Sequence, residues 1–167
     1  MATDWADVYR KTYPDLVRFL HRKVWDPERA RDLAQEVFVR ALEHDPDDTR
    51  AWLFTIAANL ARDEARSAIR RKQHLELLVT TIDRPEPPNP IERIEAAEQM
   101  KAVKAALARL SERDREVLLL WDAGLDYGQI ASHTGLARTA VGTTLARARR
   151  KLVEAYDVGE GSHESLG

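Results

Sequence analysis

Apolar side chains recur at the spacing of amphipathic helices along most of this chain. A clear example covers residues 30–42, where apolar residues share one helical face: Ala30, Leu33, Ala34, Val37, Phe38, Ala41 and Leu42. Asp26 and Pro27 precede that stretch as an N-cap and a first helical residue. Similar patterns predict a helix over residues 3–24, which we expect to break at Pro14, and a long helix over residues 49–72.

The second half of the chain contains an apolar run, residues 117–121, that fits a strand or a helix by its pattern alone. The box formed by Ser111 and Asp114 before the run is typical of a helix start. Gly124 after the run is typical of a helix end. These flanking signals favour a helix.

Two further helices are predicted after Gly124. Asp126 and Gln129 form a second capping box, which begins a short helix. Gly135 is expected at positive φ in a tight turn after that helix. The helix that follows the turn is expected to bury four apolar residues on one face: Val141, Leu145, Ala148 and Leu152.

Proline is unevenly distributed, and this divides the chain. Four of the seven prolines lie between residues 85 and 90, where no helix can continue. We therefore predict an all-α protein of two small helical domains, residues 1–72 and 91–156, joined by a Pro-rich linker over residues 73–90. Residues 157–167 are predicted to form a disordered tail.

Composition narrows the class of protein. The chain has 167 residues, 44% hydrophobic and 32% charged, with a net charge of −2, as expected of a soluble globular protein. Cysteine is absent, which excludes disulfides and thiolate zinc sites and fits a cytoplasmic location. The histidines are scattered and the glycines form no phosphate-binding loop. We therefore expect no enzyme, no metal and no cofactor.

One face of the predicted helix over residues 49–72 carries a mixed set of polar groups. At about 100° per residue, four side chains lie within about 40° of Asn59, and these are Trp52, Asp63, Arg66 and Arg70. Cations can bind phosphates, an amide can read base edges and an aromatic ring can stack on an unpaired base. The pattern indicates a nucleic-acid surface, but a solvated face with an Asp63–Arg66 pair and a core Trp52 fits it too.

The last predicted helix has a second basic segment. Residues 138–151 contain five Lys and Arg and no acid, and they follow two short helices and a tight turn. This is the organisation of a helix-turn-helix whose third helix enters the major groove of DNA. A three-helix bundle with a basic helix end is the alternative interpretation.

Three segments together resemble the extracytoplasmic-function (ECF) branch of bacterial RNA polymerase sigma factors. They are RDLAQEVFVRALE (31–43), AWLFTIAANLARDEARSAIRRK (51–72) and LSERDREVLLLWDAGLDYGQIASHTGLARTAVGTTLARARRKL (110–152), within a resemblance over residues 5–155. The first resembles the polymerase clamp-binding segment, the second the minus-ten helix of region two, and the third the minus-35 reader of region four.

The resemblance assigns a role to particular residues. It implies polymerase contacts at Asp32, Gln35, Glu36 and Phe38. It implies minus-ten contacts along the face of Trp52, Asn59, Asp63, Arg66 and Arg70, and minus-35 contacts at Arg138, Thr139, Thr143 and Arg147. The implied function is to direct core RNA polymerase to promoter DNA and to assist promoter melting. The implied partners also include an anti-sigma factor, which holds most members of the branch inactive.

The third segment departs from the family pattern. Ala137 stands where the family commonly has a capping Ser, and Gly142, Thr143 and Thr144 replace a basic-Ser-Arg run. An interior Gly and a lost cap each cost about 1 kcal/mol of helix stability. We therefore expect weaker or altered minus-35 reading. The main alternative function is a stand-alone helix-turn-helix regulator, and a protein-binding helical adaptor comes after it.

Overall fold

Helices account for all the regular structure in the part of the chain that the computed structural model describes, residues 3–75 and 90–164. Their bounds are α1 (Trp5–Val24), α2 (Pro27–Ala41), α3 (Thr49–Leu75), α4 (Pro90–Ala108), α5 (Glu112–Asp122), α6 (Tyr127–Thr134) and α7 (Arg138–Glu164). The all-α prediction is confirmed. The Pro-rich linker prediction falls largely on residues 76–89, outside the described residues.

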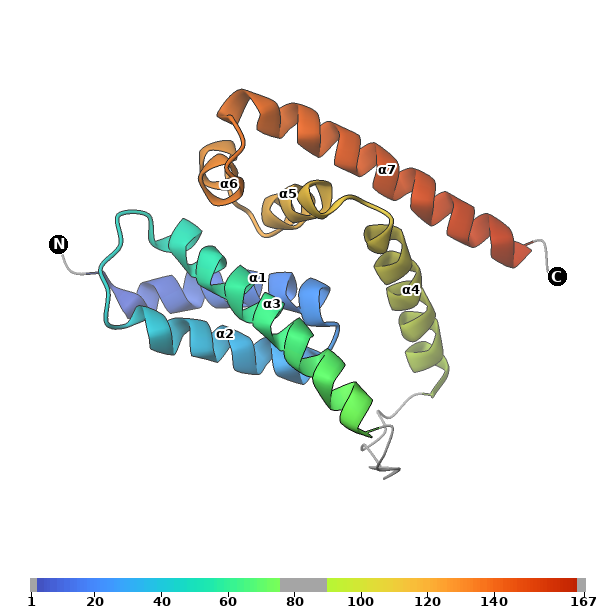
Figure 1. The fold of residues 1–167 in the computed structure, drawn as a ribbon, viewed down its shortest axis with the longest axis horizontal. Helices are drawn as coiled ribbons and strands as arrows, with labels where there is room; N and C mark the ends of the chain where they lie inside the picture. The colour runs from blue at the N-terminus through green and yellow to red at the C-terminus, as the bar shows by residue number, and fades with distance from the viewer. Residues whose placement is uncertain (1–2, 76–89, 165–167) are drawn as a thin grey trace.

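The first helical unit consists of α1, α2 and α3, which cross one another around an apolar core (Figure 1). Phe19 of α1 and Phe54 of α3 meet edge to face in this core, with ring centroids 5.3 Å apart. The N-cap predicted at Asp26 is present, because its carboxylate accepts a hydrogen bond from the Glu28 N–H at 3.0 Å. Local sequence signals and core packing therefore agree in this unit.

The predicted break at Pro14 is wrong, because α1 continues through this residue. Proline cannot donate to the carbonyl of Arg10, one turn earlier. Both residues lie on the exposed side of α1, where water can solvate that carbonyl. Core packing of Thr12 before the proline and of Leu16 after it holds both halves of the helix in line.

The second helical unit consists of α4 to α7, with α7 lying against each of the other three (Figure 1). Its core includes Leu107, Val117, Leu120, Leu125, Ile130, Val141 and Leu145. Ser111 caps α5, and both bonds of the Asp126–Gln129 capping box are formed at the start of α6. Gly135 has a φ of 77°, as the tight turn requires. The predicted helix-turn-helix is therefore present.

The C-terminal end differs from the sequence expectation. We expected the last helix to finish near residue 156, but α7 continues through two glycines to Glu164. An interior glycine weakens a helix by about 1 kcal/mol without stopping it. No proline follows within this stretch to end the helix.

Candidate nucleic-acid and polymerase-binding surfaces

The polar face of α3 stands free of the rest of the protein. Asn59, Asp63, Arg66 and Arg70 are exposed, and none of them bonds to a residue that the structure describes. The ion pair considered between Asp63 and Arg66 is not formed. These groups are therefore available to a ligand. We call this set, together with Trp52, the α3 polar face.

Trp52, at the start of the α3 polar face, is partly a core residue and partly a surface residue. Its ring is half-buried against the core and meets the ring of His44 edge to face, at 5.1 Å between centroids. Its remaining surface reaches solvent beside the loop that precedes α3. Trp52 can therefore help to pack that loop and still present part of its ring.

A partly buried ion pair fixes α3 against α2. The Arg29 Nε donates to Glu64 Oε1 at 2.8 Å, and the Glu64 side chain is only 13% exposed. The hydrogen bonds to Glu64 raise the pKa of Arg29 above its ordinary value. Glu64 directly follows Asp63 in α3, so its ion pair with Arg29 helps to fix the rotation of α3 that exposes the α3 polar face.

The predicted polymerase-binding residues lie on α2, but they are not equally accessible. Asp32, Gln35 and Glu36 are exposed, and Gln35 donates to the Tyr9 hydroxyl at 2.8 Å. Phe38 is only 6% exposed and packs edge to face on Tyr9, with centroids 4.9 Å apart. Phe38 therefore belongs to the core that supports this surface.

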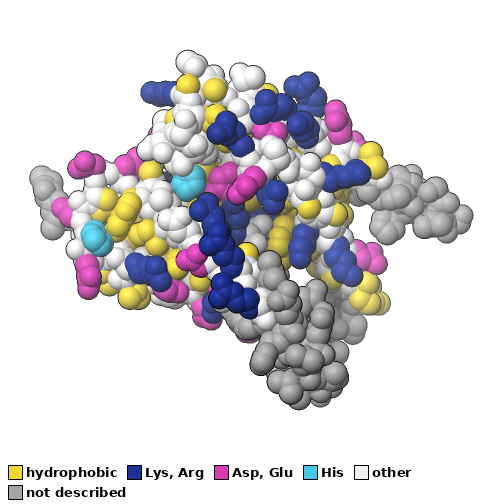
Figure 2. Space-filling model, in the orientation of Figure 1, with side chains coloured by type: hydrophobic (Ala, Val, Ile, Leu, Met, Phe, Trp, Pro, Cys, Tyr) yellow, Lys and Arg dark blue, Asp and Glu magenta, His cyan; other side chains and the backbone are white. Residues whose placement is uncertain are grey.

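The solvent side of α7 carries Arg138, Thr139 and Thr143, which are all exposed. Thr144, one of the positions that depart from the family pattern, is only 6% exposed and faces the core. Figure 2 shows Lys and Arg side chains over α7 at the top of the molecule and a further row across the middle of the visible face.

Gly142 of α7 has a packing role that the sequence did not reveal. The ring of Tyr127 lies over it, so that a Cβ built on Gly142 would be 3.4 Å from Tyr127 Cε2. The rings of Tyr127 and Trp121 also contact each other, with centroids 5.4 Å apart. The Arg149 guanidinium lies over the Trp121 ring, 5.6 Å from its centroid. Gly142 is thus the position of the recognition helix on which an aromatic cluster packs.

Arg147, the fourth predicted minus-35 residue, is bonded within the protein. Its Nη2 donates to Asp114 Oδ1 at 2.7 Å and its Nε to Asp114 Oδ2 at 3.3 Å. The hydrogen bond from Arg147 holds the pKa of Asp114 below its ordinary value, although burial opposes this. The sequence singled out Asp114 only as a capping residue of α5, because its partner lies on another helix.

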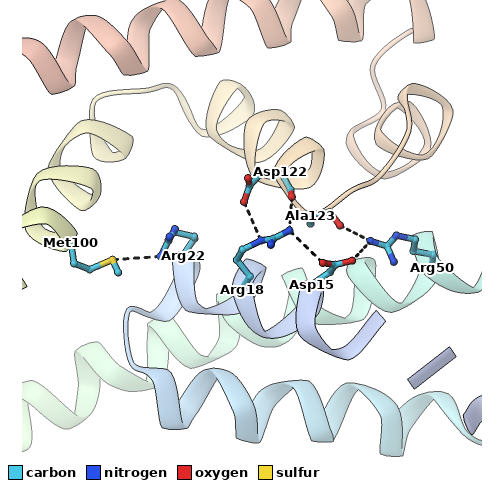
Figure 3. Close-up of polar contacts among 7 residues, drawn as sticks. All are labelled: Asp15, Arg18, Arg22, Arg50, Met100, Asp122 and Ala123. Atoms are coloured by element: carbon cyan, nitrogen blue, oxygen red, sulfur yellow. Dashed lines mark hydrogen bonds and ion pairs between the residues drawn. The ribbon is translucent and has the colours of Figure 1, made fainter. Parts of the chain in front are cut away.

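The two helical units contact each other through polar groups (Figure 3). Arg18 of α1 donates to the Asp122 carbonyl at 2.7 Å, and its Nε lies 3.3 Å from the Asp122 carboxylate. Arg50 of α3 binds the Asp15 carboxylate at 2.7 Å and donates to the Ala123 carbonyl across the interface. These contacts place the end of α5 against α1 and beside the start of α3.

A second group of interface contacts is centred on Glu116 of α5. Its carboxylate bonds Lys23 of α1 and His133 of α6, the latter at 3.1 Å. Burial would raise the pKa of Glu116, but the His133 hydrogen bond and the Lys23 charge together hold it below the ordinary value of 4.5. His133 also reaches Thr55 of α3, at 3.1 Å between Nδ1 and Oγ1.

An open cleft of about 690 Å³ remains beside these contacts. Cationic side chains line it from both units, namely Lys23, Arg62, Arg113 and Arg115. Two acids, Glu112 and Glu116, line the same cleft, and Lys23 is paired with Glu116. The interface is therefore polar, in contrast to the apolar core within each unit.

The geometry defines a two-unit helical DNA-binding protein, with a free polar helix in one unit and a helix-turn-helix in the other. The family description "Sigma-70 region 2" matches residues 8–71, and "Sigma-70, region 4" matches residues 100–152. The chain belongs to the sigma-70 family of RNA polymerase sigma factors, in its ECF branch.

Relatives of known identity agree with this membership. RNA polymerase sigma factor YlaC of Bacillus subtilis (strain 168) is 31% identical over 157 residues, which cover 87% of this chain and 88% of YlaC. ECF RNA polymerase sigma factor SigL of Mycobacterium tuberculosis is 36% identical over 147 residues, covering 82% of this chain and 80% of SigL.

Solved structures show the same fold. CnrH, solved in complex with the cytosolic domain of CnrY, has a TM-score of 0.65 and 26% identity, covering 92% of this chain and 88% of CnrH. The sigma factor RpoE of Bartonella quintana, solved with the anti-sigma factor NepR, has a TM-score of 0.64 and 24% identity, covering 93% of this chain and 98% of RpoE. None of the helices that our structure describes is long and apolar enough to cross a membrane.

Proposed function

We propose that this chain is an alternative sigma factor that brings core RNA polymerase to specific promoters and assists strand separation there. The observation that carries the proposal is the α3 polar face, whose Asn59, Asp63 and Arg66 are exposed and unpaired within the described residues. The helix that presents them is held against α2 by the Arg29–Glu64 pair, so these groups lie on a side of α3 that faces solvent.

The α3 polar face suits a single strand of DNA. Arg66 and Arg70 can bind phosphates, and the Asn59 amide can bond a base edge. The exposed part of Trp52 can stack on an unpaired base. The segment over residues 44–50, which leads into α3, would receive a base extruded from the stack, and holding that base repays part of the few kcal/mol lost on unstacking.

Upstream recognition is assigned to α7, which is placed as the third helix of a helix-turn-helix. Arg138, Thr139, Thr143 and Arg147 remain the proposed contacts to the minus-35 element. Asp32, Gln35 and Glu36 of α2 remain the proposed contacts to polymerase. Such a protein acts by binding alone, with no catalysis and no cofactor, in the cytoplasm where polymerase works.

The two units have to separate for this function. The two promoter elements lie about 25 base pairs apart, which is about 85 Å at roughly 3.4 Å per pair. In the structure, Gln129 of α6 bonds Asp48 at 3.3 Å, so the reading unit covers part of the loop before α3. We infer that polymerase opens this arrangement and that a partner of the anti-sigma type opposes the opening.

Run-off transcription with core polymerase and fragments of the host genome tests the proposal. We expect discrete new transcripts with the wild-type chain and their loss with Arg66→Ala. Arg10→Ala is the matched control, because it removes the same charge from an exposed site on α1. Specific DNA binding by the chain alone, without new transcripts, would instead support a stand-alone regulator.

A further inference from the structure

The Arg147–Asp114 pair combines a buried carboxylate with a half-exposed guanidinium. The Asp114 side chain is 1% exposed and the Arg147 side chain is 48% exposed. A buried carboxylate needs a cation as its partner. Among the described residues, Asp114 has two such partners, Arg147 and Lys151, and the Lys151 Nζ lies 3.6 Å from Asp114 Oδ2. The acid is thus fixed inside the helix-turn-helix, while part of the guanidinium remains at the surface.

The orientation of the guanidinium follows from which nitrogens are bonded. Arginine has five N–H donors in a planar fork. Asp114 takes the edge formed by Nε and Nη2. Within the described residues, no group accepts a bond from Nη1. The Nη1–Nη2 edge is therefore available, and two parallel donors of this kind bind O6 and N7 of a guanine in the major groove.

The backbone of Asp114 is fixed as well. Its N–H donates to the Ser111 Oγ at 3.1 Å, as an N-cap requires. The carboxylate does not return to the start of α5, as it would in a full capping box, and bonds Arg147 instead. The residue that the sequence marked as half of a capping box is thus committed to the recognition helix.

Holding Arg147 before DNA arrives has a physical benefit. A free arginine loses rotamer freedom when it binds a base, and this loss opposes binding. A side chain already fixed by Asp114 loses less on binding. A fixed fork also discriminates better, because a mobile cation binds phosphates and bases of any sequence.

We propose that Asp114 is a positioning residue for upstream promoter recognition, which orients Arg147 so that its free edge bonds a guanine. This inference rests on the proposed function, because it requires α7 to read DNA. It separates Arg147 from Arg138 and Arg150 of α7, which are exposed, have no acidic partner among the described residues and can bind phosphates.

Base preference measured position by position tests this role. Core polymerase with the full chain is given promoters whose upstream element is randomised, and the transcribed templates are sequenced. We expect Arg147→Lys to lower the preference for guanine at a single position by about 5- to 150-fold. Asp114→Asn is expected to lower the preference at that same position by about fivefold or more, and to leave the other positions unchanged.

Glu112→Gln is the matched control, because it removes the same charge from an exposed site on the same helix. Its base preferences should equal those of the wild type. Asp114→Glu keeps the acid but displaces it by one methylene. Asp114→Glu replaces Asp114→Asn in the test if the asparagine variant does not fold. It should lower the guanine preference at the same position.

Other outcomes would overturn the inference. If Asp114→Asn lowers the thermal stability but keeps the base preference, Asp114 is only a structural tie between α5 and α7. The same conclusion follows if all positions weaken equally. If Arg147→Lys changes no position while the wild type still directs transcription, the inference fails and the proposed function stands. If the wild type directs no transcription, both fail.

Discussion

The two helices that carry the cations proposed to bind DNA, α3 and α7, are each 27 residues long, but they hold these cations differently. On α3, Arg66 and Arg70 extend into solvent without a partner among the described residues. On α7, Arg147 is fixed by a buried acid. A free cation follows a flexible backbone of phosphates, whereas a fixed fork requires an acceptor at one place. The difference matches capture of a single strand by one unit and reading of a duplex by the other.

The supports beneath these helices differ in the same way. α3 lies on an apolar core, in which Phe54 meets Phe19 edge to face. Beside α7, an aliphatic core is joined by the carboxylate of Asp114. The α3 platform therefore depends on burial together with the partly exposed Arg29–Glu64 ion pair, whereas the α7 platform depends on burial together with an acid that is only 1% exposed. Substitutions can test each part.

The largest effect is expected from Phe54→Ala, which removes the ring under α3. Loss of a buried aromatic side chain leaves a cavity and should lower the free energy of unfolding by about 3–5 kcal/mol. Urea unfolding, monitored by far-UV circular dichroism, measures this loss of stability. Asn59→Ala, on the exposed side of the same helix, should change stability by less than about 0.5 kcal/mol. A small effect of Phe54→Ala would contradict the view that burial holds the α3 platform.

Asp114→Ala should have the next largest effect, a loss of about 1–3 kcal/mol, because charged hydrogen bonds beneath α7 disappear. The pKa of Asp114 is lower in the folded protein than its ordinary value of 3.8. Its contribution is therefore complete above that value and is lost as the pH falls through the lower, folded pKa. In urea denaturation, the free energy of unfolding of the wild type should exceed that of Asp114→Asn by the same amount at pH 7 and at pH 5. A difference that already shrinks between these two pH values would contradict a lowered pKa.

Glu116→Gln should loosen the contact between the units. The variant removes a charge bonded to Lys23 and His133, at a cost of about 1 kcal/mol to the closed arrangement. Because the chain has no cysteine, dyes can be placed at two introduced cysteines, Ser67→Cys on α3 and Ser132→Cys on α6. Energy transfer between the dyes should fall, while Glu154→Gln, at an exposed site on α7 that does not line the cleft, should leave it unchanged. Equal transfer in both variants would show that the Glu116 contacts do not hold the units together.

The smallest effect, and a favourable one, is expected from Gly142→Ala. Alanine gains up to about 1 kcal/mol of helix propensity over glycine. Its Cβ would lie at an ordinary contact distance of 3.4 Å from Tyr127. Thermal unfolding should therefore show a slightly higher midpoint. A lower midpoint would mean that the aromatic cluster beside α7 tolerates no added atom.

Local signals in the sequence were sufficient for the helix starts and the turns. Asp26, Ser111, Asp126 and Gly135 act on backbone groups within a few residues of themselves, so their roles can be read from neighbours in the chain. The free groups of α3 were also anticipated, because the helical period places Asn59 and Arg66 on one face, away from the apolar residues.

Other features depended on partners that lie far apart in the chain. Pro14 stays within a helix because the core holds both halves of α1, and Thr144 is buried because of how α7 rolls onto α5. Arg147 meets Asp114 across 33 residues of sequence.

The sequence by itself therefore determined the helices, the helix-turn-helix and the family, since these depend on local backbone interactions and on the helical period. Only the tertiary structure decided which arginine is free and which is fixed. That choice depends on which side chains from separate helices come within hydrogen-bond distance, and no local pattern encodes such a distance.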